Sequence, residues 1–346
     1  MSIVFLVTDA YGGHGGIALF NRELCAAIGE PITVIPRVVR GEIRDVPPNV
    51  TFVAGAAGSP IAYLRALAAA RRSKPDLVIC GHMNLLPVAA LDHPLLVIHG
   101  IEAWKKKRRA LLGKCRGIVS VSALTRDRLV GWSGYAGPTW VLPNAVHLEH
   151  YGIRPKRKDL LDRYHLEGKR VLLTVGRLES EERYKGFDEV LEVLGDLPED
   201  VVYMIAGGGN DFTRLQKKAR DLGLSARVVF TGLFDERDKP DLYNLADAYV
   251  MPSRGEGFGF VFLEAMACGV PVIGSKADGG REALRDGELG LLVDPTNPAE
   301  LRAAIVETLA RGERRIPPGL DYFSFEKFVE RSRAILSAAG MSRSSK

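Results

Sequence analysis

The stretch RGEGFGFVFLEAMACGVPVIG, residues 254–274, places two glutamates, Glu256 and Glu264, among glycines and apolar side chains. A strand-like run at 248–253 precedes it and another at 271–275 ends it, so the order is strand, glycine turn, buried helix and strand. A buried carboxylate without a partner is costly, so both acids must pair with protein groups or bind a ligand that carries hydroxyls. The stretch therefore predicts a parallel α/β unit with a ligand site in its turn.

The same alternation of short strands and helices extends over most of the chain, which is typical of parallel sheets covered on both faces. Strands are expected at 3–8, 32–36, 76–80, 95–99, 117–121 and 139–142, and then at 171–176, 201–207, 227–232, 248–253, 271–275 and 290–293. Helices are expected at 16–29, 60–72, 104–113 and 123–132, and then at 186–195, 211–222, 238–246, 260–268, 279–285 and 298–311. The polar, aperiodic segment 147–170 separates the two series. The sequence thus predicts two doubly wound Rossmann-like domains facing a central cleft.

Length and composition agree with two folded domains. The 346 residues exceed what one core usually supports, and 46% hydrophobic with 26% charged residues excludes a disordered chain. The first apolar run ends at Asp9, without a preceding basic region, and is too short for a signal peptide or a membrane span. The four cysteines show no C-x-x-C spacing. A cytoplasmic protein with neither disulfides nor a metal cluster is therefore expected.

The net charge of +5 and pI near 9.0 indicate an anionic partner. The densest basic run is WKKKRRALLGKCR, residues 104–116, in which charged and apolar residues alternate at helical spacing. A helix there would place Lys105–Arg109 on a cationic face beside Trp104, which suits an anionic membrane surface. An ordinary solvated helix face fits the same pattern equally well.

Cations of the second half follow its first strand. The segment VGRLESEERYKGF, residues 175–187, offers Arg177 and Lys185, and a planar guanidinium fork with a point charge matches a diphosphate. A solvated loop with two cations is the alternative.

Glu256 precedes a helix whose first N–H groups favour phosphate, so a ligand with both hydroxyls and phosphate is indicated. Otherwise Glu256 is a helix-capping acid and Glu264 pairs with an arginine of another element.

The first half offers a glycine loop and one histidine. Four glycines lie within DAYGGHGGIALFNREL, residues 9–24, and residues 13–18 match the dinucleotide pattern G-x-G-x-x-A. The second strand ends without an acidic residue for a ribose, although Arg37 could hold a 2′-phosphate. His99 ends a strand on the predicted cleft side and precedes a glycine. No D-x-D triplet and no i, i+4 histidine pair occurs, so no metal site is expected.

Together these stretches resemble the retaining nucleotide-sugar glycosyltransferases of family 4, which have the two-domain GT-B fold. The motifs that carry the resemblance are GGHGGI, VSALTRDRL, VLPNAV, VGRLESEERYKGF, IAGGG, VVFTGLF and the E-x7-E stretch that begins at Glu256. The resemblance covers nearly the whole chain. It implies an acceptor-side domain at residues 1–160, a donor domain at 161–324 and a last helix, at about 325–340, that returns to the first domain.

The resemblance also assigns roles to individual residues. Arg177 and Lys185 are expected to hold the donor diphosphate, and Glu264 the ribose hydroxyls. Glu256, Phe258 and Gly259 are expected to meet the donor sugar. The remaining donor-binding residues are Gly15 and Gly16 near the phosphate and acceptor, and Leu233 and Phe234 beside the base. The residues expected to act in catalysis are Glu256, His99, Arg177 and Lys185.

The implied activity is metal-independent, cofactor-free transfer of a hexose, with retention, from a UDP- or GDP-sugar to a glycan or lipid-linked acceptor in envelope or exopolysaccharide synthesis. The expected location is cytoplasmic, with a peripheral position on the inner face of the membrane if Lys105–Arg109 binds lipid, and no nucleic acid is expected as a partner. The acidic loop between Leu178 and Lys185, and Ala145 where glycine is common, depart from the family. The alternatives are a sugar-nucleotide epimerase of the same fold, a non-catalytic sugar-nucleotide-binding protein and an NADP oxidoreductase.

Overall fold

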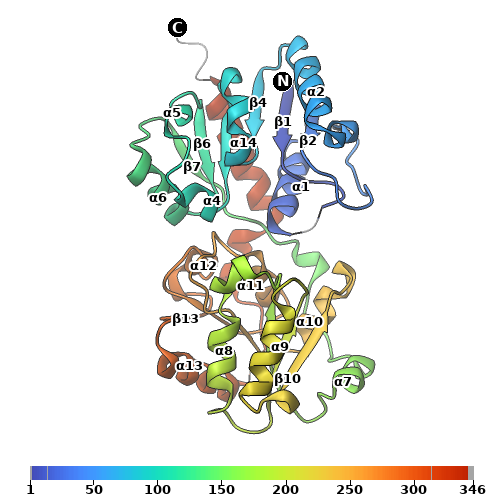
Figure 1. The fold of residues 1–346 in the computed structure, drawn as a ribbon, viewed down its shortest axis with the longest axis vertical. Helices are drawn as coiled ribbons and strands as arrows, with labels where there is room; N and C mark the ends of the chain where they lie inside the picture. The colour runs from blue at the N-terminus through green and yellow to red at the C-terminus, as the bar shows by residue number, and fades with distance from the viewer. Residues whose placement is uncertain (1, 14, 313, 342–346) are drawn as a thin grey trace. The chain divides into compact units, whose positions relative to one another are not determined.

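The chain forms two compact parallel α/β units (Figure 1). The structure, a computed structural model, describes residues 2–13, 15–312 and 314–341. The first unit comprises Met1–Ala145 and Phe325–Lys346, and the second comprises Val146–Ser324. The predicted α/β class with two Rossmann-like domains is confirmed. Among the residues described, no helix combines the length and hydropathy needed to cross a bilayer.

A seven-stranded parallel sheet forms the centre of the first unit, in the order β3-β2-β1-β4-β5-β6-β7. Every residue of the strand β1 is buried, because helices cover both faces of a doubly wound sheet. The strands are β1 (Ile3–Val7), β2 (Ile32–Pro36), β3 (Val50–Phe52), β4 (Leu77–Cys80), β5 (Leu95–Ile98), β6 (Gly117–Ser120) and β7 (Thr139–Val141). The helices are α1 (Gly16–Ile28), α2 (Pro60–Arg72), α3 (Leu86–Ala89), α4 (Ile101–Trp104), α5 (Arg109–Leu112), α6 (Ala123–Ser133) and α14 (Phe325–Met341). The strand order reverses between β1 and β4.

The last helix, α14, packs against α1 in the first unit. The rings of Phe20 and Phe328 meet edge to face with their centroids 5.7 Å apart. The Arg116 guanidinium donates a hydrogen bond of 3.1 Å to the carbonyl oxygen of Ala339. The chain therefore enters the second unit after Ala145 and returns at Phe325.

The second unit repeats the architecture with six parallel strands in the order β10-β9-β8-β11-β12-β13. Its order reverses between β8 and β11. The strands are β8 (Arg170–Val175), β9 (Val201–Ala206), β10 (Val228–Gly232), β11 (Ala248–Val250), β12 (Val272–Ser275) and β13 (Leu291–Val293). The helices are α7 (Lys158–Tyr164), α8 (Phe187–Leu194), α9 (Phe212–Asp221), α10 (Lys239–Leu245), α11 (Phe260–Ala267), α12 (Gly280–Ala283) and α13 (Pro298–Arg311).

The helix predicted over 104–113 is wrong. Two four-residue helices, α4 and α5, lie there with an extended segment between them, which includes Lys105 at φ −78° and ψ 129°. Arg108 adopts a left-handed conformation at φ 62°, and its guanidinium donates a 3.0 Å hydrogen bond to the side-chain oxygen of Asn84. The N–H of Lys107 donates to the carbonyl oxygen of Lys105 at 2.7 Å, in a tight turn that an α-helix does not contain. The short strand β3 was not predicted.

Residues 146–160, assigned from the sequence to the first domain, belong to the second unit instead. The backbone N–H of Arg154 donates to the side-chain oxygen of Asn244 at 2.8 Å, and Lys156 forms an ion pair of 2.8 Å with Asp247. These contacts join the segment to α10 and to the start of β11. The sequence contains no periodic signal for them, because the partners lie about ninety residues apart.

Candidate functional site

The strongest candidate site lies where the strand order of the second sheet reverses. Ligands of doubly wound sheets bind outside the carboxyl ends of the strands at such a point. The loop after β8 carries Arg177 and Lys185, and the loop after β11 carries Glu256. Because β8 and β11 are neighbours in a parallel sheet, both loops leave its same edge.

These three predicted residues are linked through a fourth, Glu182. The Lys185 ammonium lies 3.9 Å from the Glu256 carboxylate and 3.4 Å from one oxygen of Glu182. The Arg177 guanidinium forms an ion pair with the other oxygen of Glu182. The side chain of Lys185 is 13% exposed, whereas that of Arg177 is 64% exposed. Glu182 therefore forms ion pairs with both of the cations that the sequence assigns to a diphosphate.

Backbone contacts bring the two loops together. The N–H of Arg254 donates to the carbonyl oxygen of Tyr184 at 2.8 Å. Gly186 has φ 89°, and a Cβ at this position would lie 2.7 Å from the carbonyl oxygen of Pro252. Only glycine permits both that conformation and that approach. Lys185, between these contacts, is thereby held beside Glu256.

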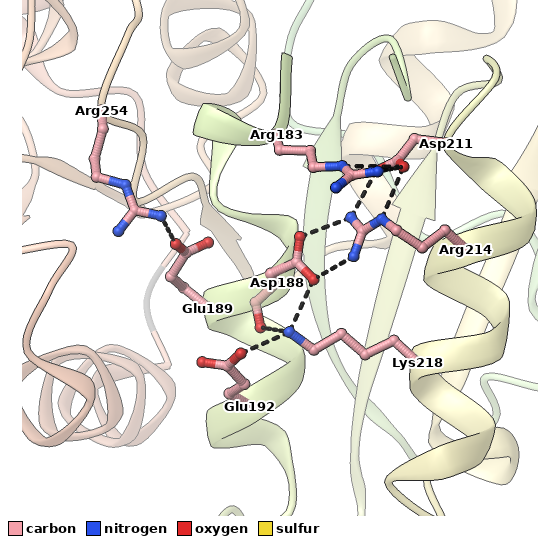
Figure 2. A network of polar contacts seen from close by, with 8 residues as sticks. All are labelled: Arg183, Asp188, Glu189, Glu192, Asp211, Arg214, Lys218 and Arg254. Carbon is pink, nitrogen blue, oxygen red and sulfur yellow. Dashed lines mark hydrogen bonds and ion pairs between the residues drawn. The ribbon is translucent and has the colours of Figure 1, made fainter. Parts of the chain in front are cut away.

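A network of ion pairs fastens both loops to the helices α8 and α9, which lie side by side (Figure 2). Arg183, from the loop after β8, donates to Asp211 at 3.0 Å. Arg214 of α9 binds Asp211 at 2.6 Å and forms two bonds of 2.7 Å to Asp188 of α8. The remaining contacts in Figure 2 join Lys218 to Asp188 and Glu192, and Arg254 to Glu189. Bidentate arginine pairs fix orientation as well as distance, so the network positions the loops.

Asp278 supports the turn that carries Glu256. The side chain of Asp278 is fully buried. Its oxygens accept hydrogen bonds from the backbone N–H groups of Glu256 at 2.8 Å and Gly280 at 3.0 Å. Burial, and to a smaller extent the neighbouring Glu256, raises the pKa of Asp278 to about 7. A Cβ on Gly279 would lie 2.0 Å from the carbonyl oxygen of Gly257, so this turn is packed too closely for any side chain there. Asp278 was not among the predicted residues.

Glu264 lies inside α11 with both oxygens occupied by protein groups. One accepts from the Lys239 ammonium at 2.8 Å and the other from the Tyr243 hydroxyl at 2.7 Å. Glu264 is 3% exposed, and burial followed by the charge of Glu264 raises the pKa of Tyr243 well above its ordinary value. In this structure Glu264 thus pairs with a cation of another element, and that cation is a lysine of α10.

The side chains of the other candidate residues in the second unit differ in how far they are exposed to solvent. Phe258 is buried with its ring 5.5 Å from that of Phe323, so its side chain is part of the core. Gly259 directly precedes α11 with φ 92°. Leu233 is 88% exposed in the loop after β10, which is unusual for a large apolar side chain, and Phe234 beside it is half-buried.

The first-unit candidates lie around the reversal point of their own sheet. Gly15 directly precedes α1 with φ 95°, and Gly16 is the first residue of that helix. His99 follows β5. Its ring nitrogen Nε2 lies 2.9 Å from the carbonyl oxygen of Gly81, and its backbone N–H donates to the side chain of Glu102 at 2.5 Å. Burial lowers the pKa of His99.

A second histidine, His82, follows β4 and was not predicted. Its ring stacks on that of His99 with centroids 6.2 Å apart. Burial lowers the pKa of His82 to about 4, although Glu102 opposes the shift. His82 lies two residues after a buried strand, close to the position that identified His99. A search of every strand end would have found it.

Comparison with known proteins identifies the family that the second unit resembles. Residues 157–316 match the family model described as glycosyl transferases group 1, a little less than half of the 346 residues. The chain is 32% identical over 214 residues to the GDP-mannose-dependent alpha-(1-6)-phosphatidylinositol monomannoside mannosyltransferase of Mycolicibacterium smegmatis, a match that covers 59% of this chain and 55% of that protein. It is 37% identical over 167 residues to the phosphatidyl-myo-inositol mannosyltransferase of Mycobacterium tuberculosis, covering 47% of this chain and 41% of that protein. The chain thus spans about half the length of these curated relatives.

Solved structures show the same fold. The Anabaena protein HepE (Alr3699), in complex with UDP and glucose, matches with a TM-score of 0.78 at 21% identity, over 98% of this chain and 100% of that protein. Sucrose-phosphate synthase from Thermosynechococcus elongatus matches with a TM-score of 0.76 at 21% identity, over 99% of this chain and 97% of that protein. The resemblance stated from the sequence is confirmed at the level of fold and family model.

Proposed function

We propose that this chain, whose residues 157–316 match the glycosyl transferases group 1, is a retaining hexosyltransferase that uses a nucleotide-sugar donor. The observation that carries the proposal is the position of Lys185. It lies between the carboxylates of Glu182 and Glu256, at the edge of the second sheet where its strand order reverses. A cation beside an acid at such an edge suits a ligand that joins a phosphate to a hydroxyl-bearing ring.

The proposed donor site uses the predicted residues. Arg177 and Lys185 bind the diphosphate, and Glu256 accepts hydroxyls of the sugar. Glu264 accepts a hydrogen bond from a ribose hydroxyl. A carboxylate offers about four acceptor positions, and Lys239, Tyr243 and Tyr151 use three of them. The remaining donor contacts proposed are those of Gly15, Gly16, Leu233, Phe234, Phe258 and Gly259.

GDP-mannose is the first donor to test, because relatives that are 32% identical are named as GDP-mannose-dependent. A UDP-hexose is the second. For the acceptor we propose a lipid-linked sugar or polyol, since several relatives are named for phosphatidylinositol. The basic segment Lys105–Arg109 would bring the protein to an anionic membrane surface where such an acceptor lies.

In the proposed reaction the bond between the anomeric carbon and the diphosphate oxygen breaks, and a bond from the acceptor oxygen forms on the same face of the sugar. The acceptor proton passes to the leaving diphosphate. Arg177 and Lys185 stabilise the negative charge that develops on this leaving group. Stabilisation of this kind is usually the largest single contribution to lowering the activation barrier. Glu256 orients the sugar, and His99 is the residue of the first unit that the family resemblance proposes for the same role. The reaction uses no metal and no cofactor.

The test is calorimetric titration with GDP-mannose, UDP-glucose and ADP-glucose, followed by incubation of the tightest binder with and without a phosphatidylinositol acceptor. We expect transfer to the acceptor with retained anomeric configuration, and unchanged turnover in EDTA. Conversion of the sugar without any acceptor would instead identify an epimerase. Tight binding without transfer or hydrolysis across an acceptor panel would favour a non-catalytic binding protein, and preferential binding of NADPH an oxidoreductase.

A further inference from the structure

A cluster of metal-ligating side chains lies outside the nucleotide-sugar site, at the beginning of the second unit. The segment VHLEH, residues 146–150, forms the short 3₁₀ helix η4 (Leu148–His150) preceded by His147. The backbone of this segment is fixed, because the N–H of Val146 donates to the carbonyl oxygen of Phe323 at 2.9 Å. Val146 also pairs with Ser324 in a parallel bridge. The cluster is thus anchored where the chain enters the second unit.

The helix geometry brings three ligands together. A 3₁₀ helix has three residues per turn, so side chains at i and i+3 eclipse each other. His147 directly precedes the helix, and its carbonyl oxygen accepts a hydrogen bond from the backbone N–H of His150 at 3.0 Å. The rings of His147 and His150 stack, with their centroids 5.1 Å apart and an angle of 26° between the planes. A carboxylate oxygen of Glu149 lies 3.1 Å from Nδ1 of His147. One ligand atom from each of the three residues lies within 4.8 Å of the others.

We propose that His147, Glu149 and His150 form a binding site for a divalent transition metal of the zinc class. Two imidazoles and a carboxylate are ligands that Zn²⁺ takes, with water completing a tetrahedron. Ligand atoms about 2.0–2.1 Å from a tetrahedral metal are roughly 3.4 Å apart. The separation of 3.1 Å between Nδ1 of His147 and the Glu149 oxygen is close to this value, and all three ligand atoms lie within 4.8 Å of one another.

The charge of the cluster also favours a cation. Glu149 supplies its carboxylate, which divalent metal ions of this class take as a ligand together with imidazoles. Glu149 and His150 are exposed, so an ion can enter directly from solvent. An i, i+4 histidine spacing is the pattern typical of an α-helical metal site. The i, i+3 spacing found here also places two side chains on the same side of the chain, because the turn between them is a 3₁₀ turn.

This site is separate from the proposed glycosyl transfer, since none of its residues takes part in the nucleotide-sugar site. The test uses protein without a polyhistidine tag, titrated with Zn²⁺ by calorimetry and with Co²⁺ by visible absorption. We expect one ion per chain and intense Co²⁺ d–d bands typical of tetrahedral coordination. The variant His150→Ala should bind at least roughly tenfold more weakly, because one of three protein ligands is lost.

Glu149→Gln keeps the size of the side chain but removes its charge, and should also weaken binding. The matched control is His165→Asn, which replaces an exposed histidine of the same unit in a conformation that asparagine tolerates. This control should leave both titrations unchanged. Equal affinity in wild type and His150→Ala, or octahedral Co²⁺ spectra with no stoichiometric binding, would overturn the proposal. Far-UV circular dichroism of each variant shows whether it has folded.

Discussion

Glu182 gives the proposed diphosphate site an internal counter-charge. It bridges Arg177 and Lys185 with one oxygen each, at a position where a diphosphate would compete for the same cations. Its side chain is only 15% exposed, so the pair with Lys185 is screened less than a surface pair. Donor binding must therefore displace the carboxylate or share the cations with it. The acidic loop that departs from the family pattern thus has a structural role at the site.

The variant Glu182→Gln should bind GDP-mannose more tightly. The amide keeps the size of the side chain but no longer competes for the cations, and the gain should be about 1 kcal/mol, or roughly fivefold in Kd. Calorimetric titration measures it. Glu181→Gln is the matched control, since Glu181 is an exposed acid of the same loop. Weaker binding in Glu182→Gln would show instead that this acid holds the cations in place.

Lys185→Ala should have the opposite effect. Removal of the ammonium takes away a charge-assisted hydrogen bond to phosphate, and binding of GDP-mannose should weaken by about 1–3 kcal/mol. Lys217→Ala on α9 removes a similar charge from an exposed ion pair with Asp221 and should leave affinity unchanged. Titration of both variants against GDP-mannose and free GDP locates the loss. An unaltered Kd in Lys185→Ala would contradict the assigned diphosphate site.

Asp188 joins α8 to α9, the two helices whose ion pairs hold the site loops. Burial alone would raise the pKa of Asp188, but hydrogen bonds from Arg214 and Lys218 outweigh burial and leave it at about 2, below the ordinary 3.8. A lowered carboxyl pKa stabilises the fold above pH ~4, and the stabilisation is lost as the pH falls toward 2. The shift corresponds to about 2 kcal/mol.

Asp188→Asn should therefore lower the free energy of unfolding by about 2 kcal/mol at pH 7. The difference from wild type should shrink as the pH falls from about 4 toward 2, because wild-type Asp188 then becomes protonated as well. Urea denaturation across this pH range measures the difference. Asp221→Asn, which breaks an exposed pair on α9, should change stability by less than about 1 kcal/mol. A pH-independent loss in Asp188→Asn would attribute the effect to packing.

The sequence identifies most of the elements because buried parallel strands and amphipathic helices have distinct periods. The strand β9 is buried at every residue and reads as a continuous apolar run, VVYMIA, so it was predicted to within one residue. The segment 104–113 has helical spacing as well, yet Arg108 interrupts it with a left-handed conformation and a hydrogen bond to Asn84. Tertiary contacts of this kind leave no periodic signal.

The sequence also predicts which candidate residues of the site lie near one another, but only for some of them. Arg177, Lys185 and Glu256 follow neighbouring strands of a parallel sheet, so their proximity follows from topology. Asp278 and Lys239 could not be predicted, since each contacts a site glutamate from 22 or 25 residues away, without a fixed spacing. Their partners are set by how the loops after β12 and β10 pack.

The charge of the whole chain, +5, is unevenly placed, and its densest cluster is the extended segment Lys105–Lys107 in the first unit. All three lysines are exposed, and among the residues described none of them forms an ion pair with a carboxylate. Trp104, which directly precedes these lysines, contacts other residues of the protein and does not serve as a membrane anchor. Its indole N–H donates to Thr125 at 3.2 Å, and the guanidinium of Arg128 lies 4.0 Å above its ring. Any attraction to lipid is therefore electrostatic.

This arrangement predicts binding to anionic membranes that depends on salt. Each lysine near the surface contributes about 1 kcal/mol, so the Lys105/Lys106/Lys107→Gln variant should lose about 3 kcal/mol of membrane affinity. High salt should have the same effect on wild type, since the screening length falls from about 8 Å at 0.15 M to about 3 Å at 1 M. Co-sedimentation with vesicles of phosphatidylserine and phosphatidylcholine, compared with phosphatidylcholine alone, measures both effects.

The matched control changes the same amount of charge elsewhere. Lys158, Lys169 and Lys217 are exposed residues of the second unit, and their triple replacement by glutamine should leave sedimentation close to wild type if position and not net charge decides. Equal losses in the two triple variants would mean that the whole protein is attracted by its net charge alone. Equal sedimentation of wild type and the Lys105/Lys106/Lys107→Gln variant would make the segment an ordinary solvated surface and favour a soluble glycan acceptor. Membrane binding that persists at 1 M salt would require an apolar anchor, which the buried contacts of Trp104 do not provide.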